Sequence, residues 1–143
     1  MGMNFEEFGQ DTGYFLSFEQ ALRAPENGVN LRIVVNRSRE VSDLLIHPHP
    51  ESNVTTYHID FPYYVTYMVS VEDFTRWNDY NTFHGDDFRI YDQSTLLDYF
   101  YKEHSVAKEL FNEPLVHYML GCHEIIVDIL SYSEPTITKV DAD

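Results

Sequence analysis

The stretch NVTTYHIDFPYYVTYMVSVEDF, residues 53–74, constrains the fold more than any other part of the chain. Apolar or β-branched side chains alternate with others along it, and this period of two residues is typical of a β-strand with two different faces. Pro62 divides the stretch into two strands, because proline has no N–H to donate to a sheet ladder. The residues expected to share one face are Thr55, Tyr57, Ile59 and Phe61 before Pro62, and those expected on the corresponding face of the next strand are Tyr63, Val65, Tyr67, Val69 and Val71.

A β-hairpin is expected near the amino terminus. Residues 14–24 and 29–35 both alternate, and the sequence PENG between them contains the Asn-Gly pair that favours tight hairpin turns. A short helix is the competing interpretation of the first segment, since Ser17 and Gln20 have the spacing of a capping box. The turn sequence favours the hairpin.

Further strands are expected in three places. VSDLLIH, residues 41–47, is expected to form a third strand that ends at the prolines of HPHP. Residues 88–91 suggest a short strand. The sequence LVHYMLGCHEIIVDILSY, residues 115–132, returns to strand periodicity on both sides of a bend at Gly121-Cys122.

Helix is expected only between residues 94 and 112. In STLLDYFYKEH, Leu96, Leu97, Phe100 and His104 fall on one helical stripe, and Ser94 is a suitable N-cap. A second short helix is expected in VAKELF, residues 106–111. The predicted fold is therefore a single α+β domain over residues 1–143, built on an antiparallel β-meander.

The meander is expected to form a sheet or half-open sandwich of about 6–8 strands. It carries one or two short helices in the 94–112 region. Residues 1–12 and 134–143 are expected to be flexible tails.

The charge balance limits the classes of partner. The chain has 24 Asp and Glu residues against 9 Lys and Arg, a formal net charge of −15. Nucleic acids and anionic membranes are bound by neutralising their negative charge, so neither is expected as a partner. The acidic start, MGMNFEEFGQD, does not resemble a secretion signal, and the one cysteine fits a reducing compartment. We expect a cytoplasmic protein with a basic protein partner and without a cofactor.

No established catalytic motif is present. The patterns G-x-G-x-x-G, G-x-x-x-x-G-K-[ST], G-x-S-x-G and H-E-x-x-H do not occur. Cys122 is expected to be a buried structural residue, with His117 forming a hydrogen bond at a sheet edge, rather than a nucleophile with its base. No catalytic residue is therefore assigned.

A metal site is the runner-up interpretation. On an extended chain, His47 and His49 of LLIHPHPE would point to the same side, and His58 on a neighbouring strand could supply a third ligand. The segment lacks the flanking glycines of a cupin-like H-x-H site, and its prolines favour a loop. We interpret it as a strand end, and a metal-binding β-protein or enzyme using these three histidines remains the alternative.

The segment VEDFTRWNDYNTFHGDDFRIYD, residues 71–92, is the predicted partner-binding surface. It interleaves aromatic side chains with acidic ones, a combination that suits a basic protein partner. The candidate contact residues are Glu72, Asp73, Trp77, Asp79, Tyr80, Asp86, Asp87 and Asp92. The opposing interpretation is that the aromatic residues belong to the core and the acids only maintain solubility.

Three segments carry a resemblance to other proteins: YFLSFEQAL, LLIHPHP with YHIDFPYYVTYMVSVEDF, and VHYMLGCHEIIVDILSYSEPTI. In these the chain resembles a group of small, acidic, uncharacterised bacterial proteins. More broadly, it is similar to the immunity proteins of bacterial polymorphic-toxin and contact-dependent-inhibition systems. The resemblance implies a non-enzymatic protein that neutralises a basic toxin, such as a nuclease domain, by covering its active site.

A structural or regulatory homodimer is a further alternative. In such a dimer an exposed strand edge would pair with its own copy. A monomer and a homodimer are both compatible with the sequence.

Overall fold

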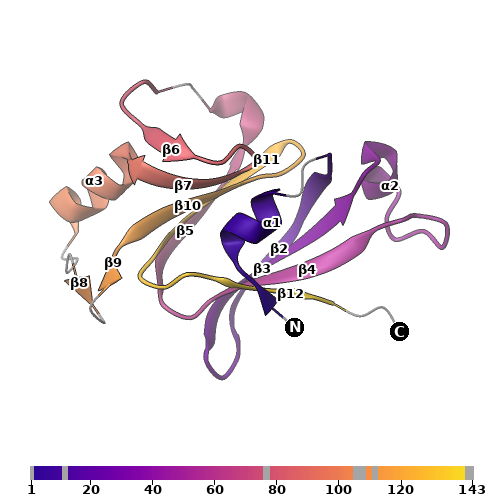
Figure 1. The fold of residues 1–143 in the computed structure, drawn as a ribbon, viewed down its shortest axis with the longest axis horizontal. Helices are drawn as coiled ribbons and strands as arrows, with labels where there is room; N and C mark the ends of the chain where they lie inside the picture. Colours follow the sequence, from indigo (N-terminus) through magenta and orange to yellow (C-terminus); the bar gives the residue numbers. More distant parts are fainter. Residues whose placement is uncertain (1, 11–12, 76–77, 105–108, 111–112, 141–143) are drawn as a thin grey trace.

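Two antiparallel sheets form the framework of the molecule (Figure 1). The computed structural model describes residues 2–10, 13–75, 78–104, 109–110 and 113–140. The strands of the first sheet are, in spatial order, β1 (Gly2–Met3), β12 (Thr136–Lys139), β4 (Thr55–Phe61), β3 (Val29–Ser38) and β2 (Phe15–Glu26). Those of the second sheet are β5 (Tyr64–Val71), β11 (Ile125–Ser131), β10 (Val116–Gly121), β7 (Phe88–Gln93) and β6 (Thr82–His84). The predicted antiparallel α+β fold is confirmed.

The alternating segments of the sequence supply the inner faces of both sheets. The hairpin predicted from PENG is β2–β3, and β2, β3 and β4 form a meander. Pro62 marks the point where the chain leaves the first sheet and enters the second. Wholly buried residues from the two sheets meet in one core, including Leu31, Ile33, Val35, Ile59 and Phe61 from the first and Leu120, Val127 and Ile129 from the second.

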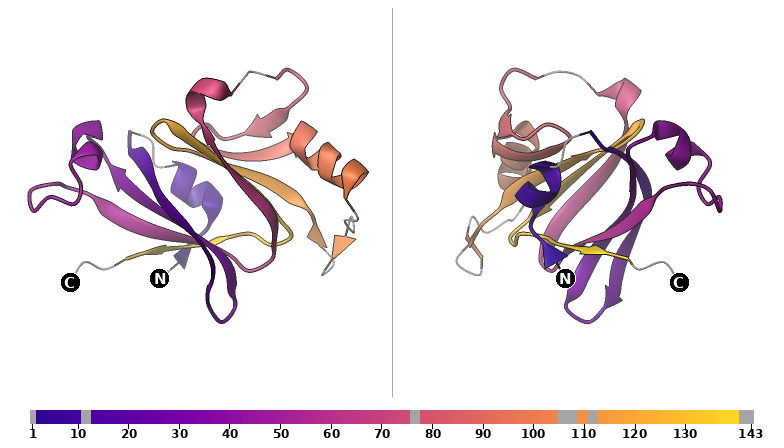
Figure 2. Two further views of the ribbon diagram at one scale, coloured as in Figure 1. Left: turned by 180° about the vertical axis from the view of Figure 1, so that it is seen from behind. Right: turned by 45° about the vertical axis from the view of Figure 1, so that its right-hand side comes forward.

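Within the described residues four short helices, one of them 3-10, accompany the sheets, and two of them cover particular surfaces. Helix α1 (Phe5–Gln10) lies over the opening between the sheets (Figure 2). Its residues Phe5 and Phe8 are wholly buried. Helix α3 (Thr95–Glu103) covers one end of the outer face of the second sheet, where its apolar side packs on Leu115, Leu130 and Tyr132. The rest of that outer face is left open. No helix in the described ranges has the length and apolar character needed to cross a membrane.

The predicted helix and its N-cap are confirmed, whereas His104 of the predicted stripe follows the last residue of α3 and is exposed. Ser94 precedes the helix with extended backbone, and its hydroxyl accepts a hydrogen bond from the Leu97 N–H at 3.1 Å. The predicted second helix lies largely outside the described residues. Within it, Glu109–Leu110 form strand β8, which pairs with β9 (Glu113–Pro114).

The strand predicted over VSDLLIH is wrong. Residues Val41–Leu45 form helix α2, a single turn in which Leu44 alone is buried. The topology gives the reason: the two strands that flank this connection are already paired on both sides, β3 with β2 and β4 and β4 with β3 and β12, so neither offers it a free edge.

The two expected tails also differ from the prediction. Residues 2–10 form β1 and α1, and Thr136–Lys139 form β12, which pairs with β4 and β1. Phe5, Phe8 and Ile137 are wholly buried, so burial of these apolar side chains anchors both segments in the core.

Candidate functional site

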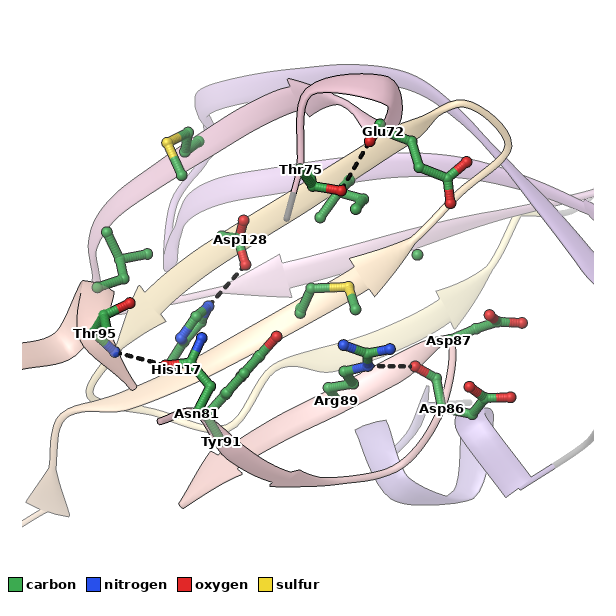
Figure 3. Close-up of a pocket in the computed structure, with 15 residues that line it drawn as sticks. Glu72, Thr75, Asn81, Asp86, Asp87, Arg89, Tyr91, Thr95, His117 and Asp128 are labelled. Atoms are coloured by element: carbon green, nitrogen blue, oxygen red, sulfur yellow. Dashed lines mark hydrogen bonds and ion pairs between the residues drawn. The ribbon is translucent and has the colours of Figure 1, made fainter. Parts of the chain in front are cut away.

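The open part of the second sheet's outer face contains a cavity of about 400 Å³ (Figure 3). Side chains of β5, β11, β10 and β7 form its floor, and the first residues of α3 close one end. These strands are far apart in sequence and are brought together by the order β5-β11-β10-β7. We call this feature the acidic cavity, because most of the charged side chains that line it are carboxylates.

Four carboxylates line the acidic cavity, against the guanidinium of Arg89. Glu72 begins the 3-10 helix η1 (Glu72–Phe74), Asp86 and Asp87 occupy the turn between β6 and β7, and Asp128 projects from β11. Carboxylates on a concave surface concentrate negative potential, because the walls exclude water that would screen them. The cavity is therefore suited to a cationic group.

The guanidinium of Arg89 is held by groups other than these carboxylates. Its Nε donates a hydrogen bond to the backbone oxygen of Asp86 at 2.9 Å, and its Cζ lies 4.0 Å from the centre of the Phe83 ring. Cation–π contact with an aromatic face satisfies part of its charge there. Much of the negative charge of the cavity remains available to a ligand.

The pKa of the Asp87 carboxyl group reflects this excess of negative charge. Partial burial raises the pKa of Asp87 above its ordinary value of 3.8, and the neighbouring charges of Asp86 and Glu72 raise it further, while Arg89 lowers it. Folding therefore disfavours the ionised form of this side chain. The protonated form of Asp87 favours the folded state, and this contribution to the free energy of unfolding is lost as the pH rises through the folded-state pKa.

Replacing Asp87 with asparagine is expected to stabilise the fold at neutral pH by about 0.5 kcal/mol, because the neutral amide removes a repulsive charge. The gain should shrink as the pH falls through about 3.9, the ordinary pKa of an aspartate, because the wild-type carboxyl group then becomes protonated in the unfolded state as well as in the folded state. Urea unfolding at pH 7 and pH 3.5 measures the difference. Asp73→Asn, at an exposed position of η1, is the matched control and should show little change at either pH. A variant no more stable than wild type at pH 7 contradicts the assignment.

A buried polar chain supports one wall of the cavity. His117 of β10 is buried, and its imidazole Nε2 lies 2.8 Å from Asp128 Oδ1 while its Nδ1 lies 2.6 Å from Ser94 Oγ. The ring also stacks on Tyr91, with centroids 4.1 Å apart. With the proton on Nε2, His117 donates to Asp128 and accepts from the Ser94 hydroxyl, which itself accepts from the Leu97 N–H. Each of these buried polar groups then has a hydrogen-bond partner.

This Ser-His-Asp combination is not arranged as a hydrolase triad. A nucleophilic hydroxyl must face the substrate. Ser94 is only 1% exposed and caps α3, and it does not line the cavity. The buried polar chain connects β10, β11 and the start of α3, so its role is to position Asp128 and the helix.

The predicted contact residues divide into two groups. Glu72, Asp86 and Asp87 line the acidic cavity. Asp73, Asp79 and Tyr80 are exposed and do not line it, Asp92 is exposed and lies 3.8 Å from His84, which in turn lies 3.5 Å from Glu6 of α1, and Trp77 lies outside the described residues. The Tyr80 hydroxyl donates a hydrogen bond to the Asp98 carboxylate of α3, which raises the pKa of Tyr80. This bond links the segment to the helix beside the cavity.

The histidines of the metal alternative are not brought together. His47 Nδ1 lies 3.3 Å from Ser52 Oγ, and His49 Nδ1 accepts a hydrogen bond from the Glu51 N–H at 3.1 Å, so both make local contacts in the loop before β4. His58 lies on β4, where burial and nearby Arg32 lower its pKa. In the described part of the chain, no three His, Cys, Asp or Glu side chains are grouped to hold a metal ion.

Cys122 and His117 do not form a nucleophile with its base. Burial raises the pKa of the Cys122 thiol to about 12, and the charge of Asp87 adds to the effect. A thiol with this pKa is protonated at neutral pH and is a poor nucleophile. His117 lies on central strand β10, so the expectation that it bonds at a sheet edge is wrong.

Comparison with protein-family models, with curated proteins and with solved structures finds no significant match to this chain. Its function is therefore inferred from the geometry of the site.

Four residues of the site were not predicted from the sequence in their roles at the cavity: Arg89, Tyr91, His117 and Asp128. A usable signal was present for Asp128, because IIVDIL places a carboxylate inside an apolar strand. Such a residue on a central strand usually has a buried partner or borders a functional surface. Nothing in the sequence around His117 indicates that it is the hydrogen-bond partner of Asp128.

Proposed function

We propose that this chain is a non-enzymatic protein-binding module that neutralises a basic protein by covering part of its surface. The observation that supports the proposal best is the acidic cavity, which four carboxylates line together with one guanidinium that is held by other groups. A lysine or arginine side chain of a partner would meet several carboxylates at once. Such charge-assisted contacts are among the stronger polar interactions in proteins.

The charge of the whole chain supports the same partner class. A net charge of −15 accelerates encounter with a basic protein and disfavours acidic partners. Exposed aromatic and apolar side chains close to the cavity, such as Tyr80 and Phe74, offer anchors that charge alone does not provide.

The resemblance to immunity proteins gives the proposal its specific form. In that form the partner is a toxin, for example a nuclease domain, and the acidic surface covers its active site or nucleic-acid groove. Neutralisation is then stoichiometric and takes place in the cytoplasm. The carboxylates act as a mimic of the phosphate charge that such a groove binds.

Affinity capture from a lysate of the source cells tests the proposal. We expect the wild-type protein to retain a basic protein at low salt and to release it at high salt, because screening weakens contacts between exposed charges. The matched variant Glu72→Gln/Asp86→Asn/Asp87→Asn removes cavity charge with little change in side-chain volume and should retain much less. Co-expression of the captured protein should be toxic to cells, and the wild-type chain should relieve that toxicity. An acidic partner, or retention indifferent to salt and to the three substitutions, would overturn the proposal.

A further inference from the structure

Three of the four strands at the edges of the two sheets have features that discourage pairing with another chain. Short length, charged side chains and bulges all have this effect. Strand β1 has two residues, and β6 has three with a register irregularity. Strand β2 is long, but it has two register irregularities and carries the charged residues Glu19, Arg23 and Glu26.

The fourth edge strand, β5, lacks this protection. Its sequence, YVTYMVSV, contains no charged residue, no proline and no glycine. Its register with β11 is regular from Val71 to Thr66. Met68, Val69 and Val71 are 46%, 41% and 45% exposed. An uncharged and regular strand edge is therefore open on a chain whose net charge is −15.

The hydrogen bonds at the end of β5 show which peptide groups face outward. The Glu72 N–H donates to the Glu124 oxygen at 2.9 Å, so residues at even positions of β5 face β11. The N–H and C=O groups of Tyr67, Val69 and Val71 then point away from β11. No turn or loop backbone hydrogen bond within the described ranges uses them. They form half of a ladder that a further strand could complete.

The acidic cavity on the outer face of the second sheet extends as far as the free edge of β5. Met68 and Glu72 line the cavity, so it reaches the edge strand and its continuation. A strand added beside β5 would place every second side chain on the cavity side of the sheet. Cationic side chains at those positions would lie next to the cavity carboxylates, whereas a second copy of this chain would bring two strongly acidic molecules together.

We propose that β5 pairs with an extended segment of the partner protein that carries cationic side chains on one face, and that this segment becomes a sixth strand of the second sheet. The inference rests on the proposed function, because the partner is the same basic protein. It adds the mode of contact: backbone hydrogen bonds supply affinity, and the acidic cavity selects the charge of the added strand.

A designed peptide tests the inference without the natural partner. The probe is the acetylated and amidated peptide KVKVKVKV, and its acidic counterpart EVEVEVEV is the control. Amide hydrogen exchange is followed by NMR on the ¹⁵N-labelled full chain, with peptide added up to millimolar concentration. With the basic peptide, exchange at Tyr67, Val69 and Val71 should slow by about tenfold or more, while edge strand β2 and samples with the acidic peptide should not change.

A proline variant tests the same contact from the side of the protein. Val69→Pro removes an outward N–H and leaves the ladder with β11 intact, a setting in which edge strands accept proline. Its affinity for the labelled basic peptide, measured by fluorescence anisotropy, should fall by about tenfold. Val69→Thr keeps the N–H and should lose far less affinity than Val69→Pro. The exchange experiment on the wild-type chain remains decisive if the proline variant does not fold.

The possible failures are distinguishable. If the basic peptide binds in a salt-sensitive way and loses affinity in Asp86→Asn/Asp87→Asn, but the β5 amides stay unprotected, strand pairing is wrong and the proposed function stands. If both peptides protect the β5 amides equally, the cavity does not select the charge of the added strand, and the proposed function is weakened as well. Protection of β5 in concentrated protein without peptide would make the occupant a second copy and overturn the inference. Absence of binding by either peptide also overturns it.

Discussion

Replacing Phe8 with alanine is expected to lower the free energy of unfolding by about 4 kcal/mol, a large fraction of the stability of an ordinary domain. The side chain belongs to α1 and is wholly buried. Its ring lies 4.9 Å from that of Tyr57 in the first sheet and 4.8 Å from that of Phe88 in the second, and the guanidinium carbon of Arg37 lies 4.4 Å from its centre. Removing it would leave a cavity between the two sheets and release α1.

Urea unfolding followed by far-UV circular dichroism measures this loss. Phe15→Ala is the matched control, since Phe15 is 48% exposed and should cost less than about 1 kcal/mol. If Phe8→Ala is too unstable to purify, Phe8→Leu keeps most of the volume and should still be measurably destabilised. Equal effects at positions 8 and 15 would contradict the docking of α1.

Phe8 also matters for the site. Its partner Phe88 directly follows Asp87, so α1 packs behind the turn that carries two cavity carboxylates. We therefore expect variants that loosen α1 to disturb the acidic cavity from the opposite side of the sheet.

The strands were predictable because alternation is a local property. Ile59 and Phe61 in one strand, and Val127 and Ile129 in another, are buried on the side that the period of two indicates. The N-cap of α3 was predictable for the same reason, since Ser94 and the Leu97 N–H lie within one helical turn.

The segments that were wrong or missed depend on distant partners. Residues 41–45 have apolar side chains compatible with a strand, but both neighbouring strands are already paired. Phe5 and Phe8 lie among acidic and glycine residues and show no helical stripe long enough to recognise. Their burial depends on the gap between two sheets formed much later in the chain.

The site was predictable only in part. Its acidic character was visible in residues 71–92, and three of the named candidates line the cavity: Glu72, Asp86 and Asp87. The floor required the order β5-β11-β10-β7, which joins segments that alternation alone cannot place side by side. This is why Asp128 and its partner His117 were not recognised as part of the same site.

Replacing His117 with alanine is expected to lower the free energy of unfolding by about 3 kcal/mol, because three contacts are lost together. Asp128 loses its hydrogen-bond donor, the hydroxyl of Ser94 loses its acceptor, and Tyr91 loses a stacked ring. His117→Gln should recover part of the loss, since a carboxamide can donate to Asp128 and accept from Ser94. His84→Ala is the matched control, because the side chain of His84 is 53% exposed and its removal should change stability by less than about 0.5 kcal/mol.

A double-mutant cycle separates the His117–Ser94 hydrogen bond from the other contacts of His117. Ser94→Ala alone should cost about 1 kcal/mol through loss of the helix cap. Because Ser94 and His117 share a hydrogen bond, the double variant should be less destabilised than the sum of the single ones, with a coupling of about 1 kcal/mol. Strict additivity, or a loss at His117 no larger than at His84, would show that the buried chain does not support the cavity wall. The same variants provide a functional readout, because Asp128 without its donor should change the affinity for a cationic probe even where the fold is retained.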